Sequence, residues 1–303
     1  MRESLRRTVR GATAALTGLL TTVLVTACSV GGTEAPAAAG SAAASPRPSA
    51  SAALDWNTRP ASLAALGDSI TRGFDACGVL TDCPELSWAT GSGASVTSVA
   101  GRLLTRPAAR SWNLAASGAR MADLPAQAER AVSLRPQQVM ILMGANDACA
   151  PSTARMTPVD AYRRDFATAL RTLHRGLPEA QVFVASVPDL LRLWDVGRRN
   201  ALGRQIWKLG LCPSMLADPE ATNAAANARR QAVRKRVIAY NGVLAQECAR
   251  WEHCRSDGGA VFDYRFTEAE LSPWDWFHPS ARGQSRLAGI VYGAAFGSGA
   301  VTR

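Results

Sequence analysis

Four short polar segments, far apart along the chain, contain the residue types that acyl transfer requires. They read G-D-S-I-T at 67–71, A-S-G-A at 116–119, G-A-N-D at 144–147 and D-W-F-H at 275–278. A serine hydroxyl becomes a nucleophile when a base takes its proton, and an imidazole held by a carboxylate is a common base. Ser69, His278 and Asp275 are therefore candidates for the nucleophile, the base and the orienting acid.

The same segments contain candidate donors for the negative charge that develops on the substrate oxygen. The backbone N–H groups of Ser69 and Gly118 and the side-chain amide of Asn146 can form such an oxyanion hole. Each segment also has a purely structural interpretation. Ser69 and Asp275 can cap helices, while Gly118 and Asn146 can belong to turns.

The elements that must position these segments are predicted from apolar patterns. Strands are expected at residues 62–66, 111–114, 139–143, 181–187 and 260–262. Helices are expected at residues 96–104, 121–134, 158–173, 233–251 and 279–296. Strands that alternate with helices predict a parallel sheet covered on both faces, with its site at the carboxyl ends of the strands.

Two regions fit this pattern less well. Residues 190–225 are expected to form a helical excursion near the site, and together with residues 75–95 they are expected to supply the pocket walls. Arg230 and Arg234 lie on the polar face of the long helix and are expected to face solvent.

Taken in order, the four segments resemble those of the SGNH hydrolases, also called GDSL esterases and lipases. The resemblance covers roughly residues 61–297, with Ile70 where the family name has leucine. The stretch from Cys77 to Gly91 is similar to that of secreted, phospholipase-B-like members.

The resemblance implies a three-layer α/β/α sandwich around a five-stranded parallel sheet of flavodoxin-like order. It implies that Ser69 forms an acyl-enzyme and that His278, oriented by Asp275, is the general base. It also implies an oxyanion hole of Ser69, Gly118 and Asn146, with no metal and no organic cofactor. The expected substrates are carboxylic esters, in particular acyl lipids or phospholipids.

Two other functions stay open. An esterase for O-acetyl groups of carbohydrates or cell walls uses the same catalytic residues. A surface-binding lipoprotein without catalytic activity is the alternative from another class.

Six cysteines after Cys28 favour disulfide bonds in an exported protein. Two pairs are close in sequence, Cys77 with Cys83 and Cys248 with Cys254, which leaves Cys149 to pair with Cys212. Zinc binding is disfavoured because the chain has no C-x-x-C spacing and three histidines in all.

The start of the chain has the features of an export signal. Four arginines within residues 2–10 precede an apolar stretch at 11–26, which is short for a membrane span and ends in L-V-T-A-C. This resembles a bacterial lipobox, so residues 1–27 are expected to be a lipoprotein signal peptide and Cys28 to be acylated. Ordinary signal cleavage is the alternative. Residues 28–60, rich in Ala, Gly, Ser and Pro, are expected to be a disordered tether, and residues 61–303 the hydrolase domain.

Composition limits the class of protein and the kinds of partner. The 303 residues are 47% hydrophobic and 19% charged, as in globular proteins, and the net charge of +10 favours anionic surfaces. Nucleic acid is not an expected partner, because no nucleic-acid-binding motif occurs. We expect a monomer that is exported, either anchored by lipid on the outer side of the cell membrane or secreted.

Overall fold

The computed structural model describes residues 56–297. The predicted signal peptide, Cys28 and almost all of the predicted tether lie outside the described residues. Five parallel strands form one sheet in the order β2-β1-β3-β4-β5. The strands are Leu63–Gly67 (β1), Ser111–Asn113 (β2), Gln138–Leu142 (β3), Gln181–Val184 (β4) and Cys254–Ser256 (β5). This is the flavodoxin-like order, which confirms the predicted fold class.

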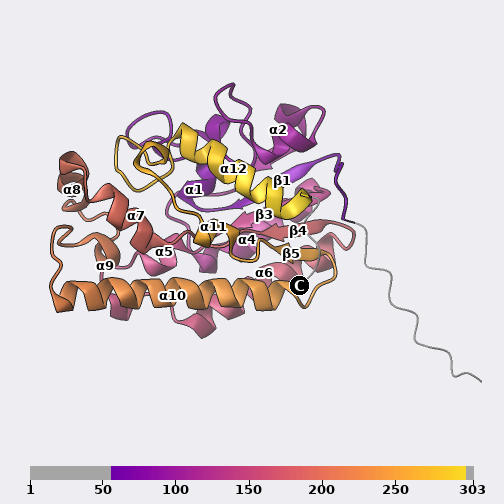
Figure 1. The fold of residues 1–303 in the computed structure, drawn as a ribbon. Helices are drawn as coiled ribbons and strands as arrows, with labels where there is room; N and C mark the ends of the chain where they lie inside the picture. Colours follow the sequence, from indigo (N-terminus) through magenta and orange to yellow (C-terminus); the bar gives the residue numbers. More distant parts are fainter. Residues whose placement is uncertain (1–55, 298–303) are drawn as a thin grey trace, which may run out of the picture. The chain divides into compact units, whose positions relative to one another are not determined.

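Helices cover both faces of the sheet, as Figure 1 shows. On one side α4 (Leu124–Leu134), α6 (Val159–Gly176) and α10 (Ala224–Cys248) pack together. On the other side lie α2 (Val99–Leu103) and α12 (Ala281–Phe296). The remaining helices are Ser69–Arg72 (α1), Pro107–Arg110 (α3), Ala145–Ala148 (α5), Leu190–Gly197 (α7), Ala201–Trp207 (α8), Pro213–Leu216 (α9) and Ala260–Asp263 (α11).

Burial explains why the central strands were readable from the sequence. Every residue of β1 and β3 is buried, so helices must cover both sides of these strands, and both positions of the pleat are apolar except at Gln138. Tyr162, Phe166 and Leu173 of α6 repeat with the helical period and are buried as well. The tyrosine ring stacks on that of Tyr240 from α10, with ring centroids 4.1 Å apart.

The predicted last strand is wrong. Residues 260–263 form the short helix α11, because Asp257 accepts the N–H groups of Gly259 and Val261 and so starts a helical turn. The fifth strand lies earlier, at Cys254–Ser256. Arg230 is also not on a solvated face, since it is 1% exposed and its guanidinium lies 3.9 Å from the centre of the Trp194 ring.

Three disulfides join the cysteines in the expected pairs, Cys77–Cys83, Cys149–Cys212 and Cys248–Cys254. The long helical excursion expected between β4 and α10 is present as α7, α8 and α9. Within residues 56–297, no helix combines the length and the apolar character needed to cross a membrane.

Candidate active site

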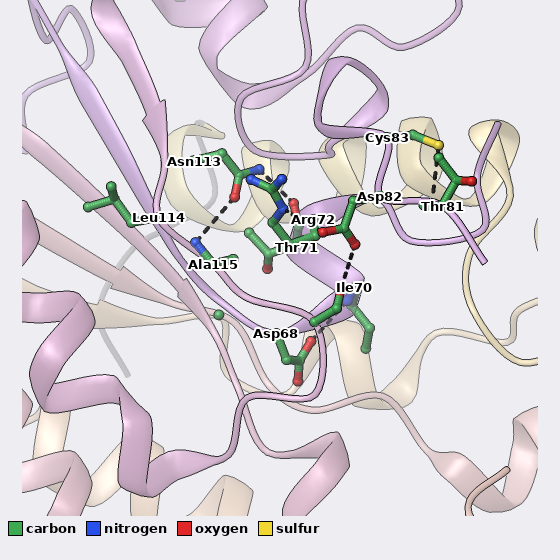
Figure 2. Close-up of polar contacts among 12 residues, drawn as sticks. Asp68, Ile70, Thr71, Arg72, Thr81, Asp82, Cys83, Asn113, Leu114 and Ala115 are labelled. Carbon is green, nitrogen blue, oxygen red and sulfur yellow. Dashed lines mark hydrogen bonds and ion pairs between the residues drawn. The ribbon is translucent and has the colours of Figure 1, made fainter. Parts of the chain in front are cut away.

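Ser69 lies where β1 turns into α1. Gly67 has a φ of +155°, and a Cβ there would collide with the carbonyl oxygen of Leu142, so the tight turn requires glycine. Asp68 caps α1 by accepting the N–H of Ile70 at 3.0 Å (Figure 2). The serine is therefore fixed at the first position of the helix, at the carboxyl end of a central strand.

His278 reaches Ser69 from the opposite end of the sequence. Its Nε2 lies 2.9 Å from the serine Oγ, and its Nδ1 lies 2.5 Å from Oδ2 of Asp275. The other oxygen of Asp275 accepts the backbone N–H groups of Phe277 and His278, each at 2.9 Å. Serine, imidazole and carboxylate thus form one buried chain of hydrogen bonds.

Burial and Asp275 act in opposite directions on the imidazole. Burial alone lowers the pKa of His278, but the hydrogen bond to Asp275 and the charges of Asp275 and Asp75 outweigh it, so the pKa is raised. Burial raises the pKa of Asp275, but the hydrogen bond to His278 and the charge of that ring lower it by more. The pKa is therefore lowered, and the carboxyl stays ionised. An imidazole with raised proton affinity beside an ionised carboxylate can act as a general base.

The segments after β2 and β3 bring further donors to the serine. Gly118 has a φ of +81° and open space where a Cβ would be, which leaves its backbone accessible. Asn146 in α5 donates one amide hydrogen of Nδ2 to the carbonyl of Ala119 at 2.9 Å, so its second amide hydrogen is free for another acceptor. Both residues line the same cavity as Ser69.

That cavity has a volume of about 210 Å³, and its lining residues fall into two chemical groups. The group that can hydrogen-bond, here called the polar side, includes Ser69, Gly118, Asn146 and His278. The apolar group, here called the apolar side, includes Phe74, Leu211 and Phe277. The structure therefore brings together all the residues that the four sequence segments single out, with Asp275 directly behind His278. A nucleophile, a base and hydrogen-bond donors around one small space can perform acyl transfer.

The pocket walls agree with the sequence analysis only in part. Leu211 and Cys212 come from the excursion at 190–225, as expected. Residues 75–95 do not contribute to the lining, and Phe74 takes their place. The rings of Phe74 and Phe277 also contact the imidazole of His278 edge-on, with centroids 5.0 and 5.2 Å away.

A second carboxyl group, which the sequence analysis does not identify, lies beside that of Asp275. Asp75 is 2% exposed, and its carboxyl, that of Asp275 and the ring of His278 place one atom each within 4.8 Å of one another. Its Oδ1 has no hydrogen-bond partner. Burial, then the charge of Asp275, raises the pKa of Asp75 to about 6. No motif marks this residue, because a loop brings it to the site.

The same three side chains could in principle hold a metal ion. Two of them, His278 and Asp275, are however already joined by a short hydrogen bond, and the apolar Phe74 and Phe277 flank the ring. A second set, Cys77, Cys83 and Glu85, has its two thiols joined in a disulfide. The donor geometry thus fits proton transfer better than metal binding.

The sequence pattern of the GDSL-like lipase/acylhydrolase family matches residues 63–291 of this chain. No curated protein matches the sequence significantly.

Several solved structures have a similar fold at low sequence identity. An extracellular lipase from Streptomyces rimosus is 17% identical, with a TM-score of 0.45, over 78% of this chain and 99% of its own. Phospholipase A1 from Streptomyces albidoflavus is 18% identical, with a TM-score of 0.48, over 78% and 99%. A variant of an acetylxylan esterase from Geobacillus stearothermophilus is 17% identical, with a TM-score of 0.49, over 80% and 97%. These likenesses are too distant to assign a substrate.

Proposed function

The chain belongs to the GDSL-like lipase/acylhydrolase family and is a carboxylic ester hydrolase, and we propose that it cleaves acyl lipids, phospholipids in particular, through an acyl-enzyme on Ser69. The observation that carries the proposal is the continuous path from Ser69 Oγ through His278 to Asp275, which opens onto a pocket with an apolar side. The polar side would hold the ester carbonyl, and Phe74, Leu211 and Phe277 would contact the acyl chain.

The first half of the reaction forms the acyl-enzyme. Ser69 Oγ attacks the ester carbonyl carbon while its proton passes to Nε2 of His278. The negative charge on the carbonyl oxygen is held by the N–H groups of Ser69 and Gly118 and by the amide of Asn146. The tetrahedral intermediate then collapses, and the alcohol leaves with the proton from His278.

The second half releases the acid by the same steps with water as the nucleophile. His278 takes a proton from water, whose oxygen attacks the acyl carbon. Collapse of the second tetrahedral intermediate breaks the bond to Ser69 Oγ, which recovers its proton from His278. Throughout, ionised Asp275 stabilises the imidazolium and fixes which ring nitrogen faces the serine.

We also propose that the protein is exported and acylated at Cys28. Three disulfides are typical of proteins outside the reducing cytosol. The lipobox-like sequence before Cys28 supports an anchor on the outer side of the membrane. Mass spectrometry of the protein from membranes of an expressing bacterium would detect the acylated, processed N-terminus.

The catalytic proposal is tested by labelling and by an ester series. A fluorophosphonate probe should label the full chain and not its Ser69→Ala variant; equal labelling of both would contradict the assignment. The purified chain should hydrolyse p-nitrophenyl esters of medium and long acyl chains as well as phospholipids. Hydrolysis restricted to acetyl esters and acetylated glycans would instead identify an O-acetyl esterase and overturn the lipid proposal.

A further inference from the structure

Most of the exposed large apolar side chains lie in segments that also build the active site. Among residues 56–297, the well-exposed ones are Val79, Leu80, Leu202, Leu209, Ile238 and Trp274. Ile238 lies apart, on α10. The other five, here called the rim residues, lie in the loop after Phe74, in α8 and its following turn, and directly before Asp275.

The loop that carries Val79 and Leu80 is fixed to the edge of the pocket. The Cys77–Cys83 disulfide closes the loop. Asp82 near its end accepts the hydroxyl of Ser117, a pocket residue, at 2.5 Å. The same carboxylate pairs with Arg72 of α1 at 3.2 Å, and Figure 2 shows the two side chains together. The loop is therefore held beside α1, the helix that begins with Ser69.

Leu80 has an unfavourable backbone conformation, and burial of its side chain does not compensate for this. Its φ is +51°, in the left-handed region that disfavours bulky residues, and 78% of the side chain is exposed. An exposed leucine gains little hydrophobic stabilisation from folding. Its apolar surface is available for binding outside the chain.

Helix α8 supports the site from its inner face. The indole N–H of Trp207 donates to the backbone carbonyl of Asp275 at 2.8 Å. Gly203 lies so close to the ring of Trp276 that a Cβ would be 3.0 Å from it. The turn after α8 leads into Leu211 and Cys212 of the pocket.

The stretch from α7 to the turn after α8 exposes apolar side chains and two cationic ones, Arg199 and Lys208. Leu202 is 57% exposed and Leu209 is 83% exposed. Residues 192–209 contain five arginine or lysine side chains and one acid, Asp195, which pairs with three of the arginines. Arg204 pairs with Glu220, so this segment and Glu220 together keep an excess of three positive charges. Lys208, next to Leu209, is exposed. Exposed leucines among excess positive charge are typical of segments that bind at membrane surfaces.

We propose that the rim residues and the cationic side chains of 192–209 dock the enzyme on an anionic phospholipid bilayer, with the active-site pocket toward the membrane. This inference rests on the proposed action on acyl lipids. Anchors on separate segments suit a bilayer, which accepts apolar side chains without a matching shape, whereas a protein partner needs a continuous complementary surface. Anionic headgroups would attract the excess arginine and lysine.

The test is vesicle flotation of the full chain carrying Ser69→Ala, so that no lipid is consumed. Vesicles of phosphatidylcholine, with or without one quarter phosphatidylglycerol, are compared. Substitution of Leu80 and Leu209 together by Ser should lower the partition coefficient by about tenfold or more on both vesicle types, since each leucine side chain loses contact with the acyl region. Lys208→Glu should lower it only on the anionic vesicles.

Matched controls come from α10. Ile238→Ser and Lys235→Glu remove an exposed apolar group and the chain's other lysine, and neither should change partitioning. Residues 1–55 are common to all variants, so their contribution cancels in the ratios. Equal partitioning of rim and control variants would overturn the docking surface, even if binding itself is strong.

The two proposals fail in different ways. With Ser69 restored, the rim variants should hydrolyse a soluble short-chain ester at the unaltered rate, which also shows that they are folded. A chain that binds vesicles through the rim but cleaves neither soluble nor vesicle esters would refute the proposed reaction alone. Loss of soluble-ester hydrolysis in the rim variants would refute the separation of docking from catalysis.

Discussion

The two sides of the active-site pocket are held in place by different means. On the polar side, Ser69, Gly118 and Asn146 each follow a strand of the sheet, so backbone hydrogen bonds between β1, β2 and β3 fix their spacing. On the apolar side, Leu211 comes from the connection between α8 and α9, which is not part of the sheet. In the proposed reaction, the residues fixed by the sheet would act on the ester group, and Leu211 would contact the acyl chain.

The apolar side depends on a few specific attachments. The Cys149–Cys212 disulfide joins the connection to the end of α5, close to Asn146. Ser214 adds a hydrogen bond from its hydroxyl to the carbonyl of Ala148 at 2.6 Å. Changes on the polar side should therefore slow hydrolysis of every ester, whereas a change at Leu211 should alter which esters are preferred.

The largest effect is expected from removal of the base. His278→Ala should lower kcat by about 10⁴-fold or more for every ester, because Ser69 loses its proton acceptor. Steady-state rates on acetyl and long-chain esters give the measurement. His174→Ala is the matched control, since His174 lies on α6 against Trp251 and should be dispensable. A near-normal rate in the His278 variant would place the base elsewhere.

Loss of one oxyanion donor should be the next largest effect. Asn146→Ala should lower kcat by about 10²–10³-fold, by the same factor for short and long acyl chains, because the carbonyl oxygen is common to all substrates. A loss that depended strongly on acyl-chain length would contradict the view that the polar side acts on all esters alike. A melting curve separates this from unfolding, since the bond to Ala119 is also lost.

Ser69 and Asn146 of the polar side were predictable from the sequence because they follow the buried strands β1 and β3. β3 is apolar from Val139 onward, so its end, and Asn146 after it, could be placed at the sheet edge without coordinates. The order of the four segments then identified His278, although nothing local distinguishes its ring from the other two histidines except the acid three residues before it.

What the sequence did not reveal depends on contacts between distant segments. Arg230 reads as a surface residue, but it donates to the carbonyls of Asp218 and Ala221 and packs on Trp194, which only the folded excursion brings near. Asp75 reads as an ordinary loop acid, because its neighbours at the site are about 200 positions away. Periodicity carries no information about such contacts.

The charge of Asp75 raises the pKa of His278, and the pH dependence of hydrolysis tests this effect. The base must be neutral, so kcat/KM should fall as pH decreases through the raised pKa of His278. Asp75, with a pKa of about 6, is mostly ionised in that range and helps to keep the imidazole protonated. Asp75→Asn removes this charge and should move the acid limb to lower pH.

The pH profile distinguishes an electrostatic role of Asp75 from a structural one. If Asp75 only supports the loop, Asp75→Asn should lower stability or kcat and leave the position of the acid limb unchanged. Glu129→Gln on α4 is the control for a change of net charge, because this exposed acid does not contribute to the pKa of His278.

The smallest effect is expected on the apolar side, and it should be selective. Leu211→Ala removes methyl groups from the wall that would contact the acyl chain, so kcat/KM for long-chain soluble esters should fall roughly tenfold. The value for acetyl esters should stay within about twofold, because an acetyl group leaves the methyls of Leu211 uncontacted. Ile238→Ala on α10 is the apolar control and should change neither. An equal loss for both ester classes would mean that Leu211 helps to place the reacting groups, and the two sides of the pocket would then act as one unit.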